Sequence, residues 1–149
     1  MRKPSILFIF FAFILSCATT ANINKDELRK KNGTGCIEGN CSNGTGIARS
    51  KDGRIYSGEW LNDKFHGEGI ILWPDGNSYT GSFKDGAQTG IGTMEWADGG
   101  SYTGNYSNGS RNGYGVHKFP NGDKYEGEFL RNTPNGKGKY TYADGTVEE

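Results

Sequence analysis

The stretch "DGNSYTGSF", residues 75–83, decides the fold of this chain because it returns at a fixed interval. Similar stretches begin at Asp52 ("DGRIYSGEW"), Asp98 ("DGGSYTGNY") and Asn121 ("NGDKYEGEF"), so that each copy lies 23 residues from the next. A fixed period of roughly 20–50 residues is typical of proteins in which small units stack on their neighbours. The sequence therefore predicts a stack of similar units instead of one thick core.

Each 23-residue unit contains two segments whose residues alternate between the two faces of a strand. With Tyr56 as position 0, every unit has Tyr at 0, Gly at 2 and an aromatic residue at 4, then Gly at 11 and 13 and an aromatic residue at 17. Alternation with a period of two, interrupted by turn residues, is typical of a β-hairpin. The repeated structural glycines are Gly58, Gly67, Gly69, Gly81, Gly90, Gly92, Gly104, Gly113, Gly115, Gly127, Gly136 and Gly138.

The aromatic residues lie on the same face as these glycines. A glycine inside a strand is less favourable than alanine by roughly 0.5–1 kcal/mol, so we expect rings to lie across the bare backbone and to compensate for it. Most of the rings should serve packing in this way, and the face as a whole is the candidate binding face. It comprises Tyr56, Trp60, Trp73, Tyr79, Phe83, Trp96, Tyr102, Tyr106, Phe119, Tyr125, Phe129 and Tyr142. Position 15 shares this face and holds Ile71, Met94, His117 and Tyr140.

An Asp-Gly or Asn-Gly pair closes each unit, as in "PDG" at 74–76 and "PNG" at 120–122. This pattern predicts a three-residue hairpin loop in which the Gly adopts a positive φ. One carboxylate per turn does not provide the six to eight oxygen ligands that calcium prefers. We therefore expect no metal site at these turns.

The turns at the other end of the hairpins keep their length but change their chemistry. They span residues 61–66, 84–89, 107–112 and 130–135 and carry Lys64, His66, Lys84, Arg111 and Arg131. Variable loops on a constant scaffold are places where a partner can be recognised.

The two ends of the array differ from its middle, as capping units do. Residues 33–55 keep the glycines of the pattern but lack its Tyr and rings, and Glu148 stands where the next Tyr is due. Five units with two strands each predict about ten strands and, at about 4.8 Å per strand, a sheet some 45 Å long. The predicted fold is all-β: one elongated, single-layer, twisted antiparallel sheet of stacked β-hairpins, open instead of closed into a barrel.

Cys36 and Cys41 lie in the degenerate first unit, in "GCIEGNCSNG". An even number of cysteines in an exported chain favours a disulfide. Free thiols are the alternative, whereas a metal site would need further ligands, and His66 and His117 lie elsewhere in the sequence.

The N-terminus has the three parts of a secretory signal. Arg2 and Lys3 form a positive segment, 4–15 is mostly apolar, and the small Ser16 precedes Cys17. Twelve helical residues span about 18 Å, well short of the roughly 30 Å hydrocarbon core of a bilayer. A cleaved signal over residues 1–16 is therefore preferred to a permanent membrane span.

The ending "ILSC" resembles the bacterial lipobox, which implies that Cys17 is acylated and becomes the first residue of the mature protein. Leu15 departs from the small residue usual at its place. The alternative is cleavage by the ordinary signal peptidase after Ala21. Several acyl chains would hold the protein stably on a membrane, with residues 17–32 as lipid-anchor cysteine and flexible tether. Ala18 after the Cys favours the outer membrane.

The sequence "YSGEWLNDKFHGEGIILWPDG", which begins at Tyr56, and its copies resemble MORN repeats, a 23-residue family with the pattern Y-x-G-x-W/F, then G-x-G, then D-G. The resemblance divides the chain into a degenerate capping repeat at 33–55 and repeats at 56–78, 79–101, 102–124 and 125–147. It implies stacked hairpins that serve as protein-interaction and self-association scaffolds, with lipid binding also proposed. It implies no catalytic residue and no cofactor.

The leading hypothesis is a non-enzymatic, membrane-anchored scaffold for protein–protein interaction in a bacterial cell envelope. The chain has 17 basic and 17 acidic residues, and removal of residues 1–16 leaves 15 basic residues against 17 acidic ones. A nucleic-acid partner is therefore not expected, because that class needs a basic surface.

Three alternatives differ in class. Rings spaced along hairpins could bind the glycans of a cell wall, and the basic turn residues could bind phospholipid headgroups, although five such residues on a neutral chain argue against strong membrane electrostatics. An enzyme is disfavoured because His66 and His117 fall at different repeat positions and no Ser-His-Asp, paired-carboxylate or metal constellation stands out.

Overall fold

The structure is a computed structural model and describes residues 24–149. The expected signal peptide (1–16) and lipid attachment at Cys17 lie outside the described residues. Within residues 24–149, no helix has the length and apolar character that a membrane crossing requires.

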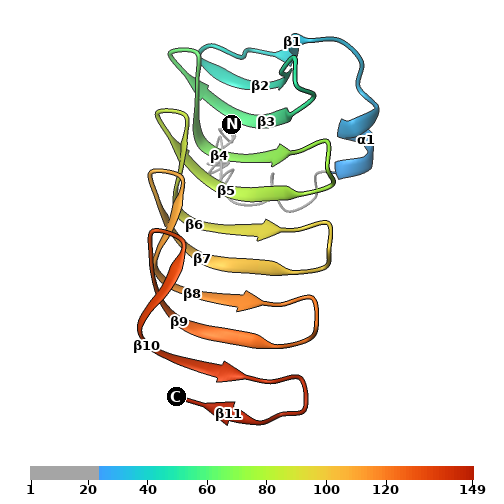
Figure 1. The fold of residues 1–149 in the computed structure, drawn as a ribbon. Helices are drawn as coiled ribbons and strands as arrows, with labels where there is room; N and C mark the ends of the chain where they lie inside the picture. The colour runs from blue at the N-terminus through green and yellow to red at the C-terminus, as the bar shows by residue number, and fades with distance from the viewer. Residues whose placement is uncertain (1–23) are drawn as a thin grey trace, which may run out of the picture.

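The described chain forms one open antiparallel sheet in which every strand pairs with the next one in sequence, preceded by one short helix (Figure 1). The predicted all-β fold is thus confirmed. The elements are α1 (Lys25–Lys30), β1 (Gly35–Gly39), β2 (Gly44–Arg49), β3 (Ile55–Leu61), β4 (Lys64–Leu72), β5 (Ser78–Lys84), β6 (Ala87–Glu95), β7 (Ser101–Ser107), β8 (Ser110–Lys118), β9 (Lys124–Leu130), β10 (Thr133–Thr141) and β11 (Val147–Glu148).

The sheet has eleven strands where about ten were predicted, because the last Asp-Gly turn reverses the chain once more. Val147 and Glu148 pair with Thr141 and Tyr140 of β10, which makes β11 the eleventh strand and the C-terminal edge of the sheet.

The Asp-Gly turns have the predicted geometry. In the turn at residues 74–76, the Trp73 N–H donates to the Asn77 carbonyl at 3.0 Å and the Gly76 N–H donates to the Trp73 carbonyl at 3.2 Å. Gly76 has φ +96°, a value that L-residues rarely adopt. The Asp75 carboxylate accepts the Asn77 N–H at 3.0 Å and so closes the loop from within.

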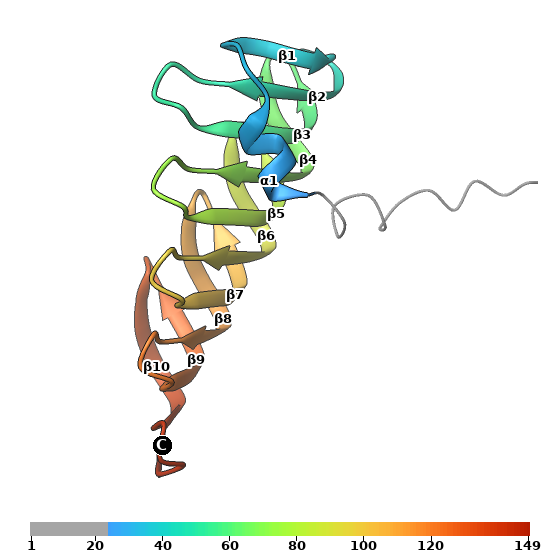
Figure 2. The ribbon, with the colours of Figure 1, turned by 90° about the vertical axis from the view of Figure 1, so that its right-hand side faces the viewer.

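The strands of each repeat are bent where a β-bulge interrupts their pairing. In the β3–β4 pair the register shifts after the Gly58–Gly69 pair, so that Gly67 and Glu68 face no partner of their own. Gly67 has φ +53°, the left-handed conformation that glycine accepts without strain. The same shift recurs in the β5–β6, β7–β8 and β9–β10 pairs. The variable turns, predicted over 61–66 and its equivalents, are shorter than expected, because β3 ends at Leu61 and β4 already begins at Lys64. The half of the sheet next to these short turns curls out of the plane of the other half (Figures 1 and 2).

The bend creates an inner face, which we define as the face that carries Tyr56, Tyr79, Tyr102 and Tyr125. Within each repeat the Tyr ring meets the aromatic residue at position 4 edge-to-face, as in Tyr79 and Phe83 at 5.2 Å. Between repeats it meets the next one in the same way, as in Tyr79 and Tyr106 at 5.1 Å. The alternating contacts form a continuous ring ladder from Trp60 to Tyr125, which is the core of this single-layer sheet.

A line of glycines runs across the strands beneath the ring ladder. Gly46 pairs with Gly58, Gly58 with Gly69, and the line continues through paired glycines to Gly138. A Cβ atom on Gly92 would lie 2.2 Å from the Tyr79 hydroxyl oxygen. The rings therefore cover bare backbone, as the sequence predicted.

The helix α1 packs on the outer face, opposite the ring ladder, and corrects the expectation of a flexible tether for residues 24–32. Leu28 is buried against Ile55, Ile70 and Leu72. Lys25 forms an ion pair with Glu95. A helix of six residues is marginal in water by itself, so these tertiary contacts are what hold it.

Candidate functional site

The twelve rings of the candidate binding face fall into two groups. Six of them are at most 7% exposed, so the interpretation as a binding surface is wrong for this half of the set. They form the ring ladder, because the bend of the sheet folds positions 0 and 4 inward. These six rings are Tyr56, Tyr79, Phe83, Tyr102, Tyr106 and Phe129.

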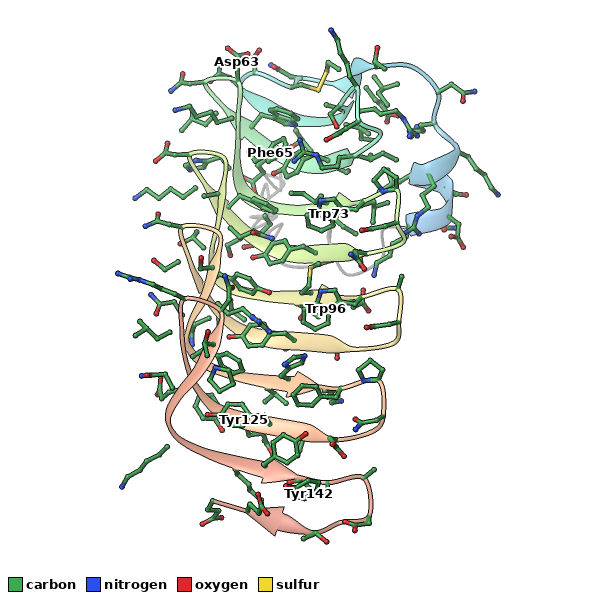
Figure 3. All side chains as sticks on the ribbon, in the orientation of Figure 1. Asp63, Phe65, Trp73, Trp96, Tyr125 and Tyr142 are labelled. Carbon is green, nitrogen blue, oxygen red and sulfur yellow. A yellow bond between two sulfur atoms is a disulfide. The ribbon has the colours of Figure 1, made fainter. Side chains whose placement is uncertain are left out.

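The other six rings are only partly buried. Trp60 and Tyr125 are the two ends of the ring ladder. The remaining four occupy position 17 and follow the Asp-Gly side of the inner face; Figure 3 shows three of them, Trp73, Trp96 and Tyr142, one above another. We call these four the ring row: Trp73, Trp96, Phe119 and Tyr142.

Two further rings join the ring row and were not among the predicted binding residues. The His117 ring lies 5.1 Å from Trp96 and 4.1 Å from Phe119, and the Tyr140 ring lies 5.8 Å from Phe119 and 4.8 Å from Tyr142. Both rings could have been predicted from the sequence. They occupy position 15, which lies two residues before position 17 and therefore on the same face of a strand. The ends of β6, β8 and β10, with the residue that follows each strand, thus present a continuous strip of rings: Trp96, His117, Phe119, Tyr140 and Tyr142.

Arg111 lies in β8, on the inner face, and not in a solvent-exposed turn. Its guanidinium carbon is 5.4 Å from the Tyr102 and Phe129 ring centroids and 5.8 Å from that of Trp96. It also donates to the Asn132 carbonyl at 2.7 Å. Arg111 thus contributes little to the basic edge that the sequence suggested.

In the repeat 56–78, an aromatic ring occupies the position that the Arg111 guanidinium occupies in the repeat 102–124. Phe65, at the same repeat position as Arg111, stacks on Tyr56 with centroids 3.8 Å apart and planes at 10°. In these two repeats position 9 therefore covers the Tyr, whereas Gln88 and Pro134 occupy the position in the other two.

His117 is the titratable group within the strip. Burial lowers its pKa, the nearby Arg111 cation lowers it further, and the Asp98 carboxylate opposes the shift. The pKa values of the strip residues Tyr140 and Tyr142 are raised, chiefly because their hydroxyl groups donate to the carboxylates of Asp123 and Glu148. At neutral pH the strip is therefore uncharged, and its charges lie along its two sides.

A pocket of about 480 Å³ opens on the inner face at the N-terminal end. It exists because the first unit carries Ala48 and Ser50 at positions 15 and 17, where later units carry larger side chains. Trp60 and Phe65 form its apolar wall.

Cys36 and Cys41 form a disulfide beside this pocket. The Sγ atom of Cys41 lies over Gly46, so a Cβ atom at Gly46 would be 2.8 Å from the sulfur. The disulfide therefore takes the place of the Tyr that this unit lacks.

Among residues 24–149, no group of three or more His, Cys, Asp or Glu side chains is arranged to hold a metal ion.

The repeats were compared with known protein families. The MORN repeat matches four consecutive segments, residues 56–78, 79–101, 102–124 and 125–147, which together span more than half of the chain. The matched boundaries coincide with the predicted repeats. A comparison with curated proteins found no match. From the family match and the stacked hairpins, the chain belongs to the MORN repeat family.

Proposed function

We propose that this protein is a non-catalytic scaffold that binds a protein partner through the ring row and is anchored in a bacterial cell envelope by an acylated Cys17. MORN repeats are in general protein- or membrane-binding modules. The observation that carries the proposal is the ring row itself, four partly exposed rings at equivalent places in successive repeats.

The ring row has the composition of a contact surface. Aromatic residues are enriched in protein interfaces, and Trp and Tyr supply a large share of their binding energy. Trp73 and Trp96 of the row pack against the ring ladder, and side chains already ordered in this way lose little conformational entropy on binding. The outer face of the N-terminal repeats is already occupied by α1.

The first test is cross-linking in cells of tagged full-length protein, with mass spectrometry of the captured proteins. The test variant carries Ala at Trp73, Trp96 and Phe119, and the matched control carries Ala at Ile91 and Tyr114, which are exposed at positions 12 of their repeats. We expect one envelope protein to be captured by the parent and the control and lost in the test variant. Equal capture by all three proteins would contradict the proposal.

The anchor is tested separately by Cys17→Ala. The lipobox-like "ILSC" supports acylation, and the variant should move from the membrane fraction to the soluble fraction. A variant that stays with the membranes would contradict the anchor but not the ring row.

Glycan binding is the second candidate, favoured by the continuous strip from Trp96 through His117 to Tyr142. Aromatic rings stack on sugars, and a strip longer than one ring could hold several of them. Titration with peptidoglycan or polysaccharide, read by Trp fluorescence, tests it. A shift that disappears in Phe119→Ala, which keeps all three Trp reporters, would move the function to this class.

A further inference from the structure

The ring row has a definite period along the sheet. Its members lie one repeat apart, which is two strands, or about 9.6 Å at the usual strand spacing. The contacts bring one pair slightly closer than this value: His117 lies 5.1 Å from Trp96 and 4.1 Å from Phe119, so the Trp96 and Phe119 rings are at most about 9.2 Å apart.

This period matches one turn of a polyproline II helix. Polyproline II has three residues per turn and rises about 3.1 Å per residue, or about 9.3 Å per turn. The difference from about 9.6 Å amounts to less than about 1 Å over the three intervals of the ring row. A segment in this conformation would therefore place an equivalent residue on each successive ring.

The two sides of the ring row carry opposite charge. On the Asp-Gly side stand the exposed Asp75, Asp98 and Asp144, one for each turn that follows Trp73, Trp96 and Tyr142. On the other side the Arg111 guanidinium lies 5.8 Å from the Trp96 ring. A ligand with basic residues would place them toward the carboxylates and away from Arg111.

We propose that the ring row binds a proline-rich segment in the polyproline II conformation, with basic residues at every third position directed to Asp75, Asp98 and Asp144. This inference rests on the proposed function, because it names the partner class of the same surface. The proline rings pack on the aromatic faces, and polyproline II binds to aromatic-lined grooves at low entropy cost because the segment is already extended. The carboxylates stand in three of the four turns, with Asn121 at the equivalent place after Phe119, and they set the phase of the segment.

Other surfaces fit this ligand less well. The ring ladder is sealed, and the N-terminal pocket is a single hollow without a period. Exposed Ile91 and Tyr114 lie at position 12, and the equivalent residues Glu68 and Lys137 break the row on both sides.

The test uses full-length protein and a synthetic peptide of four Pro-Pro-Arg triplets, with binding followed by Trp fluorescence and by calorimetry. Two peptides serve as controls. One has Gly in place of every Pro, which keeps the charge and removes the polyproline II conformation. The other has the same composition with Arg out of the three-residue phase. We expect each control peptide to bind at least tenfold more weakly.

Protein variants test the site. Trp96→Ala with Phe119→Ala should weaken binding of the triplet peptide at least tenfold, whereas Ile91→Ala with Tyr114→Ala should leave it unchanged. Because the ring variants could lower stability, Asp98→Asn with Asp144→Asn provides an independent test on exposed side chains. The Asn oxygen can still accept the hydrogen bonds from the Gly100 and Thr146 N–H groups. This variant should bind severalfold more weakly and with a smaller salt dependence.

Equal binding of the Pro and Gly peptides would overturn the proposal, because the attraction would then be charge alone. Absence of binding to the triplet peptide, with cross-linking of an envelope protein still dependent on the ring row, would overturn it while the proposed function stands. Absence of both would overturn both.

Discussion

The Sγ atom of Cys41 packs directly on Gly46, where an added Cβ atom would come within 2.8 Å of the sulfur. One repeat later, the hydroxyl oxygen of Tyr56 covers Gly69, where an added Cβ atom would come within 2.5 Å of that oxygen. A disulfide and a tyrosine ring thus perform the same task at equivalent places, which is to cover a glycine that lets two backbones approach. The capping unit therefore replaces a ring by a covalent bond at the end of the array.

The disulfide should stabilise mainly the N-terminal unit. A bond that closes a loop of about six residues contributes about 2 kcal/mol in the chain-entropy treatment. We expect Cys36→Ala with Cys41→Ala to lower the free energy of unfolding of β1 and β2 by about this amount. Hydrogen exchange should show faster exchange there and unchanged exchange in β7–β9, since each repeat contacts only its neighbours. Uniformly faster exchange would contradict this.

Gly92 should not tolerate a methyl group. A Cβ atom there would lie 2.2 Å from the Tyr79 hydroxyl oxygen and 2.5 Å from its Cζ atom. Because the Tyr79 ring is fully buried and cannot move freely, Gly92→Ala should destabilise the protein by about 1–3 kcal/mol. Urea unfolding measures this. Gly100→Ala is the matched control, because the nearest atoms lie 3.2 Å or more from its Cβ position; an equal loss in both variants would refute the explanation.

Leu28 should decide whether α1 stays on the sheet. It is 5% exposed between Ile55, Ile70 and Leu72, and its truncation to Ala removes the main apolar contact of a six-residue helix. We expect a loss of about 2–3 kcal/mol in the local stability of the helix and rapid proteolysis within residues 24–32. Leu61→Ala, at a site 44% exposed, should have little effect.

Arg111 should stabilise the inner face as a cation beside three rings. Partly buried cation–π contacts contribute about 0.5–2 kcal/mol, and the hydrogen bond to the Asn132 carbonyl adds to this. Arg111→Ala should therefore lower the midpoint of thermal unfolding by several degrees, whereas Arg131→Ala in the exposed neighbouring turn should not. Equal midpoints for the two variants would argue against the contact.

Stability should fall as the pH is lowered through the range of His117. The pKa of His117 is lowered in the folded protein, chiefly by burial, whereas in the unfolded chain it is about 6.5. Between those two values the unfolded state binds more protons, so stability decreases as the pH falls below about 6.5. His117→Phe keeps a ring in the strip and should remove this part of the pH dependence of unfolding. An unchanged dependence would show that His117 is not its source.

Much of the fold could be predicted because it depends on interactions between residues close together in the sequence. The three-residue Asp-Gly turn, the alternation of positions 0, 2 and 4, and the partnership of rings with glycines all depend on residues a few places apart. The binding face could be predicted only in part. Tyr79 and Trp96 follow the same alternation, yet one is fully buried and the other is partly exposed.

The sequence alone determined the 23-residue period, the hairpins, the open sheet and the family. Tertiary structure decided which rings remain available to a partner, that Arg111 turns inward, that α1 docks on the outer face and that the chain makes an eleventh strand. The physical reason is that burial depends on the bend at Gly67 and its equivalents and on the side chains of neighbouring strands. These contacts join residues distant in sequence, and no alternating pattern within one strand specifies them.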